Sequence, residues 1–255
     1  MSAPQNASSL PKTAILLWTS NGLQVSSDLV QLLKIARENY AWPAGVSPAK
    51  SQNRIFTLEN DTARRMNNLT KDSAHEIIID VSEWAGNNTP SHTKIINAAP
   101  EILDKMFHAL QFLANPKLLG KGIKSLCEIP GIRLVIASKI YRFCVPQLGA
   151  AVDRHASYFF NSLPDQQGIM STNFSREWSN GRHVSSRLAI YTDKGFSLNF
   201  DEYINIYLPL LNGIATWLNS NNHQYVSAHS RVPEDWKAAD VEMAAYFWWA
   251  GHGLR

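Results

Sequence analysis

The sequence predicts a mainly α-helical protein with at most a small β element. Apolar residues recur at three- and four-residue spacing through most of the chain, which is the pattern of amphipathic helices. Helix start and stop signals border several of these segments. Strand-like alternation is confined to short stretches between residues 164 and 200. With 45% hydrophobic residues the chain can bury a core, and we expect a loose leader at 1–12 followed by a single domain at 13–255.

In the first half of the chain, Ser27 is expected to cap a helix that continues to about Tyr40. Its apolar stripe is predicted to comprise Leu29, Leu32, Leu33 and Ile35. The stretch from Trp42 to Arg54 contains two prolines and is expected to be a loop. Further helices are expected at roughly 59–70, 73–85 and 100–114, the last beginning just after Pro100.

In the second half, a helix is expected from just after Asp153 to about Leu163. Alternation at 186–191 and 196–200 predicts a short hairpin that turns around residues 193–195. A helical pattern follows at 201–219. The last helix is expected to begin at Pro233, with two acidic residues in its first turn, and to end at Gly251.

Several functional classes lack support. Cys127 and Cys144 are too few for a disulfide framework or an iron–sulfur cluster, and the eight His have no metal-ligand spacing. No GxGxxG or P-loop motif is present, so neither a cofactor nor a metal is predicted. Apolar runs such as Ala14 to Trp18 are too short to cross a membrane, and no secretory signal is evident. A cytoplasmic protein with reduced thiols is expected.

The positive charge of the chain is concentrated in one segment. The formal net charge is only +3. Residues 116–156 hold seven basic and two acidic side chains, a net charge of +5, while 1–115 is neutral and 157–255 carries −2. This segment therefore carries more positive charge than the whole protein, which is expected if a polyanion contacts one face only.

This basic segment contains a hairpin signal between Leu126 and Ile140. Pro130 and Gly131 predict a turn between two short amphipathic helices. The turn N–H groups and the N-terminus of the second helix suit a phosphate. Basic side chains flank the turn, namely Lys124, Arg133, Lys139 and Arg142. The alternative is an ordinary helix–turn–helix corner with a solvated basic face.

These residues resemble the helix-hairpin-helix superfamily of DNA glycosylases, in particular the 8-oxoguanine DNA glycosylase fold. The matching positions are Leu126, Ile129, Pro130, Gly131, Ile132 and Ala137, followed by Asp153 at a helix start. The match covers about 115–163, with a hairpin core at 117–163, and extends to a Trp-Gly-like loop at 82–88 and to residues 236–243 of the last helix.

The resemblance implies a monomer that binds double-stranded DNA containing a modified base. The residues expected to contact DNA are Lys124, Ile129, Pro130, Gly131, Ile132, Arg133, Arg142 and Arg154. Two positions depart from the family pattern. Arg133 replaces the second hairpin glycine, and Val135 occupies the position of the lysine that attacks the sugar in bifunctional members. Valine cannot form a Schiff base, so a monofunctional enzyme is expected.

Asp153 is the predicted catalytic residue. Cleavage of an N-glycosidic bond builds positive charge on the sugar, and a fixed carboxylate can stabilise it and orient or deprotonate a water. The alternative role is the N-cap of the following helix, and the two roles are compatible. Lys139 lies one helical turn after Val135 and is expected to border the base pocket. It could contact the base or act as a displaced nucleophile, or it could simply contact phosphate or solvent.

An extruded base must be held by stacking and edge contacts. The candidate pocket residues are Trp84, Asn87, Asn88, Asp240, Glu242, Phe247 and Trp248, although aromatic residues in such helices commonly belong to the core. Three functional hypotheses follow: a monofunctional DNA glycosylase, a non-catalytic DNA-binding module, and a glycosylase/lyase with Lys139 as nucleophile. For the substrate, the resemblance implies 8-oxoguanine in DNA repair. It equally admits glucosylated hydroxymethylcytosine of phage DNA, removed in bacterial anti-phage defence, which we favour slightly.

Overall fold

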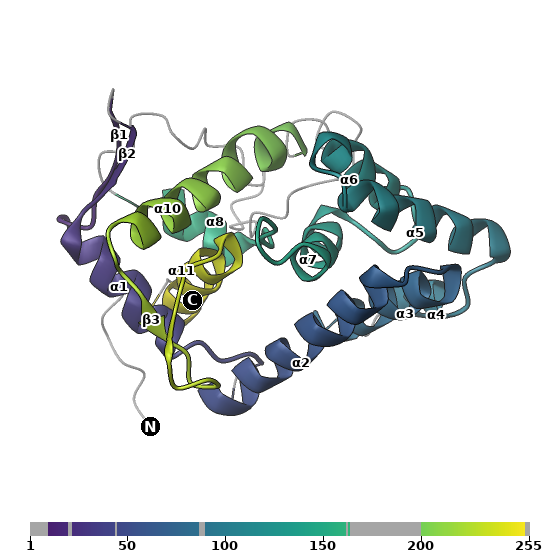
Figure 1. The fold of residues 1–255 in the computed structure, drawn as a ribbon, viewed down its shortest axis with the longest axis horizontal. Coiled ribbons are helices and arrows are strands. Elements are labelled where there is room, and N and C mark those ends of the chain that lie inside the picture. The colour runs from purple at the N-terminus through teal and green to yellow at the C-terminus, as the bar shows by residue number, and fades with distance from the viewer. Residues whose placement is uncertain are drawn as a thin grey trace, which may run out of the picture.

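The fold was analysed in a computed structural model, which describes residues 10–19, 22–43, 45–86, 90–161, 163 and 200–252. Helices dominate these ranges, as the sequence predicts (Figure 1). The strands form two small antiparallel sheets, β1 (Leu16–Thr19) with β2 (Gly22–Val25) and β3 (Tyr225–Val226) with β4 (Pro233–Glu234). The strand signals at 186–199, including the expected turn at 193–195, lie outside the described residues.

The helices follow one another in a simple order along the chain. They are α1 (Ser27–Glu38), α2 (Pro48–Asn67), α3 (Lys71–Trp84), α4 (Pro90–Ile96), α5 (Pro100–Leu113), the 3-10 turn η1 (Pro116–Leu118), α6 (Leu119–Cys127), α7 (Leu134–Cys144), α8 (Arg154–Asn161), the π-helical turn η3 (Tyr203–Tyr207), α10 (Leu208–Ser220) and α11 (Ala238–His252).

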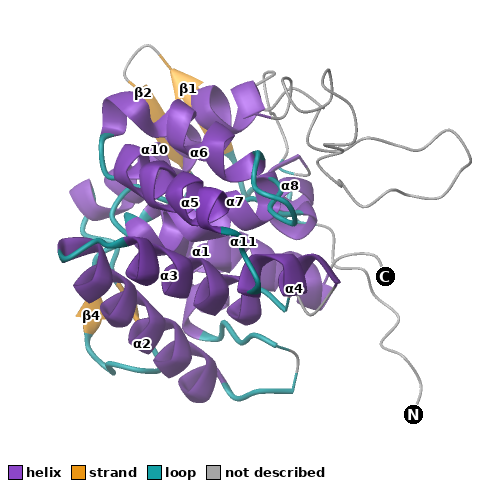
Figure 2. Ribbon diagram, turned by 90° about the vertical axis from the view of Figure 1, so that its right-hand side faces the viewer, coloured by secondary structure: helices purple, strands orange, loops and turns teal. Residues whose placement is uncertain are grey.

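The helices form two groups that differ in their position along the chain (Figures 1 and 2). In the outer group, α11 packs against α1, α8 and α10, so this group combines the N-terminal and C-terminal parts of the chain. In the middle group, α5 packs against α3 and α6, and α7 packs against α3 and α6. The long helix α2 lies along the middle group and contacts α3 and α7.

The first helix begins where its capping signal predicts, within one residue. Ser26 is the N-cap, and its side chain accepts a hydrogen bond from Leu29 N. The predicted apolar stripe is wrong at one position, because the side chain of Ile35 is 55% exposed. At 100° per residue, Ile35 points away from the face that buries Leu29 and Leu33.

The loop predicted from Trp42 to Arg54 is wrong in its second half. The helix α2 already begins at Pro48, eleven residues before the expected start at 59. Ser47 is its N-cap and accepts a hydrogen bond from Lys50 N. Proline at the first helical position is favourable because its missing N–H would have no helical partner. The second proline therefore marks a helix start instead of a loop.

The last helix also begins later than predicted. Pro233 and Glu234 lie in β4, where they pair with Val226 and Tyr225. The helix α11 begins at Ala238, and just before it Lys237 N donates to Asp240 Oδ2 over 2.9 Å. The acidic side chain in the first turn is thus Asp240, and Glu234 instead belongs to the strand pair.

The hairpin between α6 and α7 has the predicted form. Gly131 has a φ of +95°, a conformation that favours glycine because it has no Cβ. Within the turn, Ile129 N donates to Leu126 O and Ile132 N donates to Ile129 O, each over 3.0 Å. The side chains of these three apolar residues are buried, which fixes the turn to the core of the middle group.

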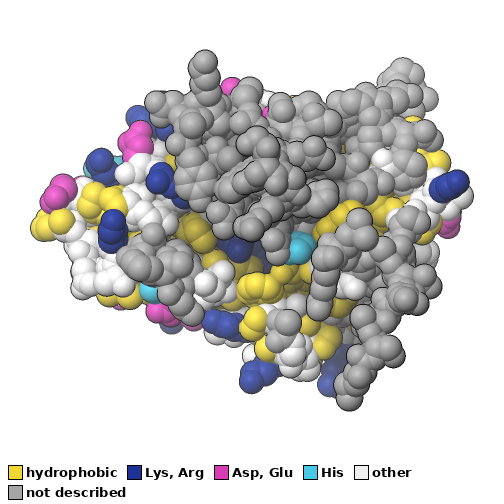
Figure 3. All heavy atoms as spheres, turned by 180° about the vertical axis from the view of Figure 1, so that it is seen from behind, with side chains coloured by type: hydrophobic (Ala, Val, Ile, Leu, Met, Phe, Trp, Pro, Cys, Tyr) yellow, Lys and Arg dark blue, Asp and Glu magenta, His cyan; other side chains and the backbone are white. Residues whose placement is uncertain are grey.

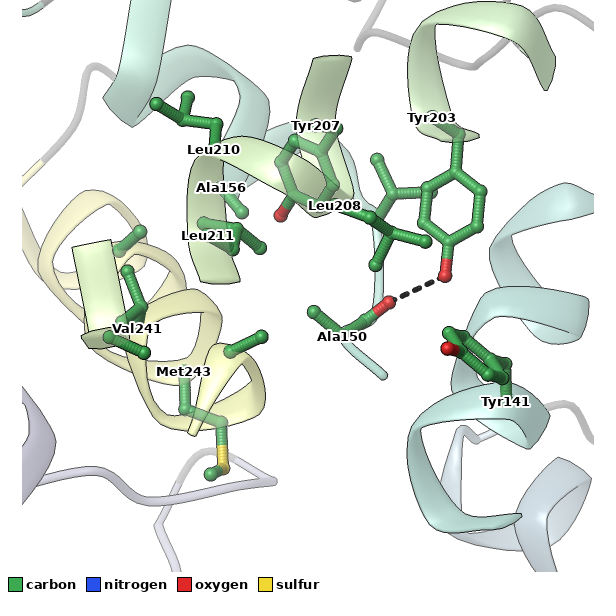
Figure 4. Close-up of a cluster of buried hydrophobic side chains, with 14 of the residues drawn as sticks. Tyr141, Ala150, Ala156, Tyr203, Tyr207, Leu208, Leu210, Leu211, Val241 and Met243 are labelled. Carbon is green, nitrogen blue, oxygen red and sulfur yellow. Dashed lines mark hydrogen bonds between the residues drawn. The ribbon is translucent and has the colours of Figure 1, made fainter. Parts of the chain in front are cut away.

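A buried cluster joins the two helical groups (Figure 4). Tyr203 and Tyr207 of η3 lie beside apolar residues of α10 and α11, and Tyr141 of α7 faces the same cluster. The hydroxyl of Tyr203 donates to Ala150 O over 2.8 Å. The core also includes Leu10, which lies in the predicted loose leader but is only 8% exposed. The leader prediction is therefore wrong at this residue.

Candidate functional site

A cavity of about 240 Å³ contains four of the predicted site residues. Its lining comes from both helical groups and from the loops that join them. The lining residues are Tyr40, Trp42, Trp84, Ala85, Lys139, Ala151, Asp153, His155, Glu242 and Tyr246. Figure 3 shows that hydrophobic, basic and histidine side chains adjoin on one face of the molecule. We call this cavity the Asp153 pocket.

Asp153 lies at the start of α8 and is half-buried. Its Oδ1 accepts a hydrogen bond from Ala156 N over 2.9 Å, so Asp153 is the N-cap of α8. The same side chain lines the pocket. The capping role and a position beside a ligand therefore occur together, as the sequence allows.

The loop that carries Asp153 is held by side chains that the sequence does not single out. The Ser138 hydroxyl donates to Val135 O over 2.9 Å and accepts from Val152 N over 3.0 Å. The Tyr203 hydroxyl binds Ala150 O from the other side. Because Val152 directly precedes Asp153, these bonds fix the backbone on which the carboxylate is carried.

The same loop approaches α7 very closely at Gly149. A Cβ at this position would lie 2.7 Å from the Cα of Arg142, so a larger residue would force the loop away from α7. Asn212 of α10 donates to Leu148 O over 3.0 Å. The loop is therefore attached to both helical groups. No local pattern predicts these contacts, because each joins segments that are distant in sequence.

Aromatic side chains and one lysine form another side of the pocket. The Nζ of Lys139 lies 5.7 Å from the centre of the Trp84 ring, which is within the range of a cation–π contact. Trp84 also packs edge-on against Phe143, with ring centres 5.0 Å apart. The indole of Trp42 donates to Trp84 O over 3.2 Å. Trp42, like Tyr40, His155 and Tyr246, is a lining residue that sequence reasoning misses.

Glu242 is the most perturbed carboxyl group of the pocket. The residue is only 5% exposed, and among the residues that the structure describes its side chain forms no hydrogen bond or ion pair. Burial, followed by the negative charge of Asp153, raises the pKa of Glu242 to about 8. Arg142 and Lys139 lower this pKa in part. At neutral pH, Glu242 is therefore mainly a neutral carboxylic acid.

The remaining predicted pocket residues do not line the cavity. Asp240 forms a buried ion pair with Arg37 at 2.8 Å and helps to cap α11, so its assignment to the base pocket is wrong. Phe247 packs near Tyr40, with ring centres 6.3 Å apart, and Trp248 packs partly buried against the core. Both are core aromatics. Asn87 and Asn88 lie outside the described residues.

The prediction that Arg142 binds DNA is wrong. Its side chain is fully buried, and its guanidinium donates to Glu59 of α2 over 2.9 Å. The guanidinium also lies 4.2 Å from the centre of the Phe143 ring. Arg142 therefore joins α7 to α2 and cannot reach a phosphate at the surface. Its helical spacing from the basic residues around it gives no sign of this burial.

The hairpin retains part of the predicted DNA-contacting set. Lys124, Pro130 and Arg133 are exposed. The side chains of Ile129 and Ile132 are buried, so only their backbone could face a ligand, and Ile132 N–H is already bonded within the turn. Arg133 is the N-cap of α7 and provides no side-chain cap, which leaves the first N–H groups of α7 without a capping side chain. The side chain of Arg154 lies outside the described set.

A larger groove adjoins the Asp153 pocket. It has a volume of about 600 Å³ and lies between α2, α3 and the loop before α2. Trp42 and Trp84 line both cavities. The rest of the groove is mixed in character and includes Lys50, Arg54 and Asp61. The two cavities therefore share an aromatic wall.

No family model, no curated protein and no solved structure matches this chain. Two searches of the described coordinates also gave negative results. No group of three or more His, Cys, Asp or Glu within them could hold a metal ion. No helix within the same ranges is long and apolar enough to cross a bilayer.

Proposed function

We propose that this protein is a monofunctional DNA N-glycosylase that flips out a modified base, excises it and leaves an abasic site, with Asp153 as the catalytic carboxylate. One observation carries the proposal. Asp153, Lys139, Trp84 and Glu242 come from four different elements and line a single pocket of about 240 Å³. A pocket that combines aromatic walls with a few polar groups suits a nucleobase that is stacked and bound at its edge.

The proposed reaction is hydrolysis of the bond between the sugar and the base. As this bond breaks, positive charge develops on the sugar, and the carboxylate of Asp153 stabilises it. The same carboxylate orients and deprotonates the water that adds to the sugar carbon. Hydrogen bonds from Ser138 and Tyr203 hold the loop before Asp153, which supports the fixed geometry that this role requires.

Double-stranded DNA is the proposed partner, bound by a monomer in the cytoplasm. The exposed Lys124 and Arg133 flank the hairpin turn, and the uncapped start of α7 supplies backbone N–H groups. Contacts of this kind bind phosphates and carry no sequence information. Binding is therefore expected to tolerate sequence and to weaken as salt concentration rises.

For the excised base, we slightly favour glucosylated hydroxymethylcytosine of phage DNA over 8-oxoguanine. The Asp153 pocket has the volume of about eight water molecules at roughly 30 Å³ each, which suits one planar base. A base that carries a sugar needs more space. The adjoining groove of about 600 Å³ provides it and is reached past Trp42 and Trp84. This volume favours the larger substrate and a role in anti-phage defence.

The test is base release from two DNAs. The purified protein is incubated with an 8-oxoguanine duplex and with glucosylated phage DNA, and the released base is identified by mass spectrometry. The Asp153→Asn variant is expected to release base at least about 10²-fold more slowly while binding DNA as tightly as the wild type. Asparagine can still cap α8, so the fold should be retained. Base release by this variant at the wild-type rate would refute the proposal.

One alternative has an observation in its favour. Lys139 lines the pocket, so it could attack the sugar and make the enzyme a glycosylase/lyase. Borohydride added during the reaction would then trap a covalent protein–DNA adduct, and Lys139→Gln would abolish it. If neither DNA loses a base and binding is salt-dependent, the chain is instead a non-catalytic DNA-binding module.

A further inference from the structure

The buried acidic side chains of α11 differ in how they are neutralised. Asp240 faces the guanidinium of Arg37. Glu242 has no ion-pair partner in the described part of the chain, although it is only 5% exposed. The nearby guanidinium of Arg142 is bonded to Glu59 of α2. A buried carboxyl group without a paired cation is costly to ionise, so it retains its proton.

The surroundings of Glu242 determine when that proton is lost. Burial and the charge of Asp153 favour the neutral acid, and the pKa of Glu242 is raised to about 8. The ionisable and charged groups that face it come from every element around the pocket. They are Arg37 of α1, Tyr40 after α1, Lys139 and Arg142 of α7, Asp153 before α8, His155 of α8, Tyr203 and Tyr207 of η3, and Tyr246 of α11.

Two carboxyl groups in one pocket that share one proton can divide acid and base roles. Asp153 accepts a hydrogen bond from a backbone N–H and lies at a helix N-terminus, where an anion is stabilised. Glu242 accepts no bond from the residues described around it and is more deeply buried. The environments therefore place the negative charge on Asp153 and the proton on Glu242.

We propose that Glu242 is the general acid that protonates the departing base, on the opposite side of the reaction from Asp153. This inference rests on the proposed glycosylase function and deepens it. It assigns the enzyme to base excision in which the leaving base departs as a neutral molecule. Bases whose nitrogen or oxygen must gain a proton on departure are thus the substrate class that benefits from Glu242.

The proton balance of the step closes within the two carboxyl groups. When the sugar–base bond breaks, its electron pair goes to the base, and Glu242 transfers its proton to that base. A water adds to the sugar carbon and gives its proton to Asp153. The products are the neutral base and the abasic sugar, with Glu242 ionised and Asp153 protonated. Transfer of the proton from Asp153 back to Glu242, through the pocket or solvent, restores the starting state.

The closing experiment compares the wild type with Glu242→Gln in single-turnover base release between pH 6 and pH 9. The amide keeps the size of the side chain but cannot transfer a proton. We expect the variant to be slower by about 10²-fold or more at pH 7. The wild-type rate should fall above about pH 8 as Glu242 ionises, and the variant should lack this fall. The exposed Glu101 of α5 provides the control, and Glu101→Gln should behave as the wild type.

The outcomes separate this inference from the function on which it rests. If Glu242→Gln releases base at the wild-type rate with the same alkaline fall, the inference is wrong and the glycosylase proposal stands. If the wild type releases no base from either DNA, both are wrong. Carbon-13 NMR of glutamate-labelled protein gives a readout independent of activity. The carboxyl signal that is lost in Glu242→Gln should titrate near pH 8, and titration near the ordinary value of 4.5 would overturn the inference.

Discussion

Asp240 and Glu242 lie two residues apart on α11 and are buried to nearly the same depth, at 4% and 5% exposure. Asp240 is ionised within a network in which Arg37 bonds both Asp240 and the hydroxyl of Tyr225. Tyr225 also donates to Glu234. Glu242 faces the Asp153 pocket and has no such partner among the described residues. One helix therefore carries a charge that holds the fold together and an acid that keeps its proton.

The difference shows how burial acts on a carboxyl group in opposite ways. With a cation fixed beside it, the group remains charged and joins two elements, here α1 and α11. Without a cation, burial stabilises the neutral form and gives the group a proton to donate near neutral pH. Partner geometry, rather than depth, decides which of these roles a buried acid has.

The largest expected effect comes from removing the charge of Asp240. In Asp240→Asn, the Arg37 guanidinium remains buried without a counter-charge, and we expect the free energy of unfolding to fall by about 3–5 kcal/mol. Urea denaturation measures this loss, with the exposed Asp28→Asn as the matched control. Adding Arg37→Met to Asp240→Asn should recover part of the loss. A fall below about 1 kcal/mol would mean that the ion pair does not hold α1 to α11.

Glu242→Gln is expected to have the opposite sign and to depend on pH. As pH rises from about 5 to 8, the unfolded wild-type chain ionises Glu242 while the folded chain keeps the proton, because its pKa is raised to about 8. The wild type therefore loses stability through this range, and the variant lacks this loss. Relative to the wild type, the variant should gain on the order of 3 kcal/mol between pH 5 and pH 8. Parallel stability curves from urea denaturation would contradict the comparison.

The smallest effect is expected at the edge of the Asp240 network. Tyr225→Phe removes a hydroxyl that donates to Glu234 over 3.1 Å and accepts from Arg37 over 3.4 Å. The free energy of unfolding should fall by about 1 kcal/mol, as for one ordinary hydrogen bond. Base release should be unchanged, because this residue does not line the Asp153 pocket. A change in base release without a change in stability would show that the two regions are coupled.

Local signals predict the hairpin and the position of Asp153. Pro130 and Gly131 specify the turn because only a few backbone conformations fit it, and an aspartate before a helix is a strong capping signal. The start of α2 was also available locally, since Ser47 followed by Pro48 is a helix-start signal. The prediction of a loop fails there because proline breaks a helix interior but not its first turn.

Contacts between distant segments could not be predicted in the same way. Arg142 pairs with Glu59, 83 residues earlier, and Arg37 pairs with Asp240, 203 residues later. A basic residue on a helix has the same local pattern whether it faces solvent or a buried acid. The residues that hold the Asp153 loop, such as Ser138 and Tyr203, also act through such long-range bonds. The sequence therefore identifies members of the pocket more readily than their supports.

The ion pair between Arg37 and Asp240 has a geometric consequence for α11. Successive residues of an α-helix are rotated by about 100°, so Asp240 and Glu242 project from the axis about 200° apart. Fixing Asp240 to α1 also fixes the rotation of α11 about its own axis, and with it the direction in which Glu242 points. Insertion of a single residue between them would swing Glu242 by about 100° out of the pocket while leaving the ion pair in place. The angular register of one helix is thus set by a contact on its far side.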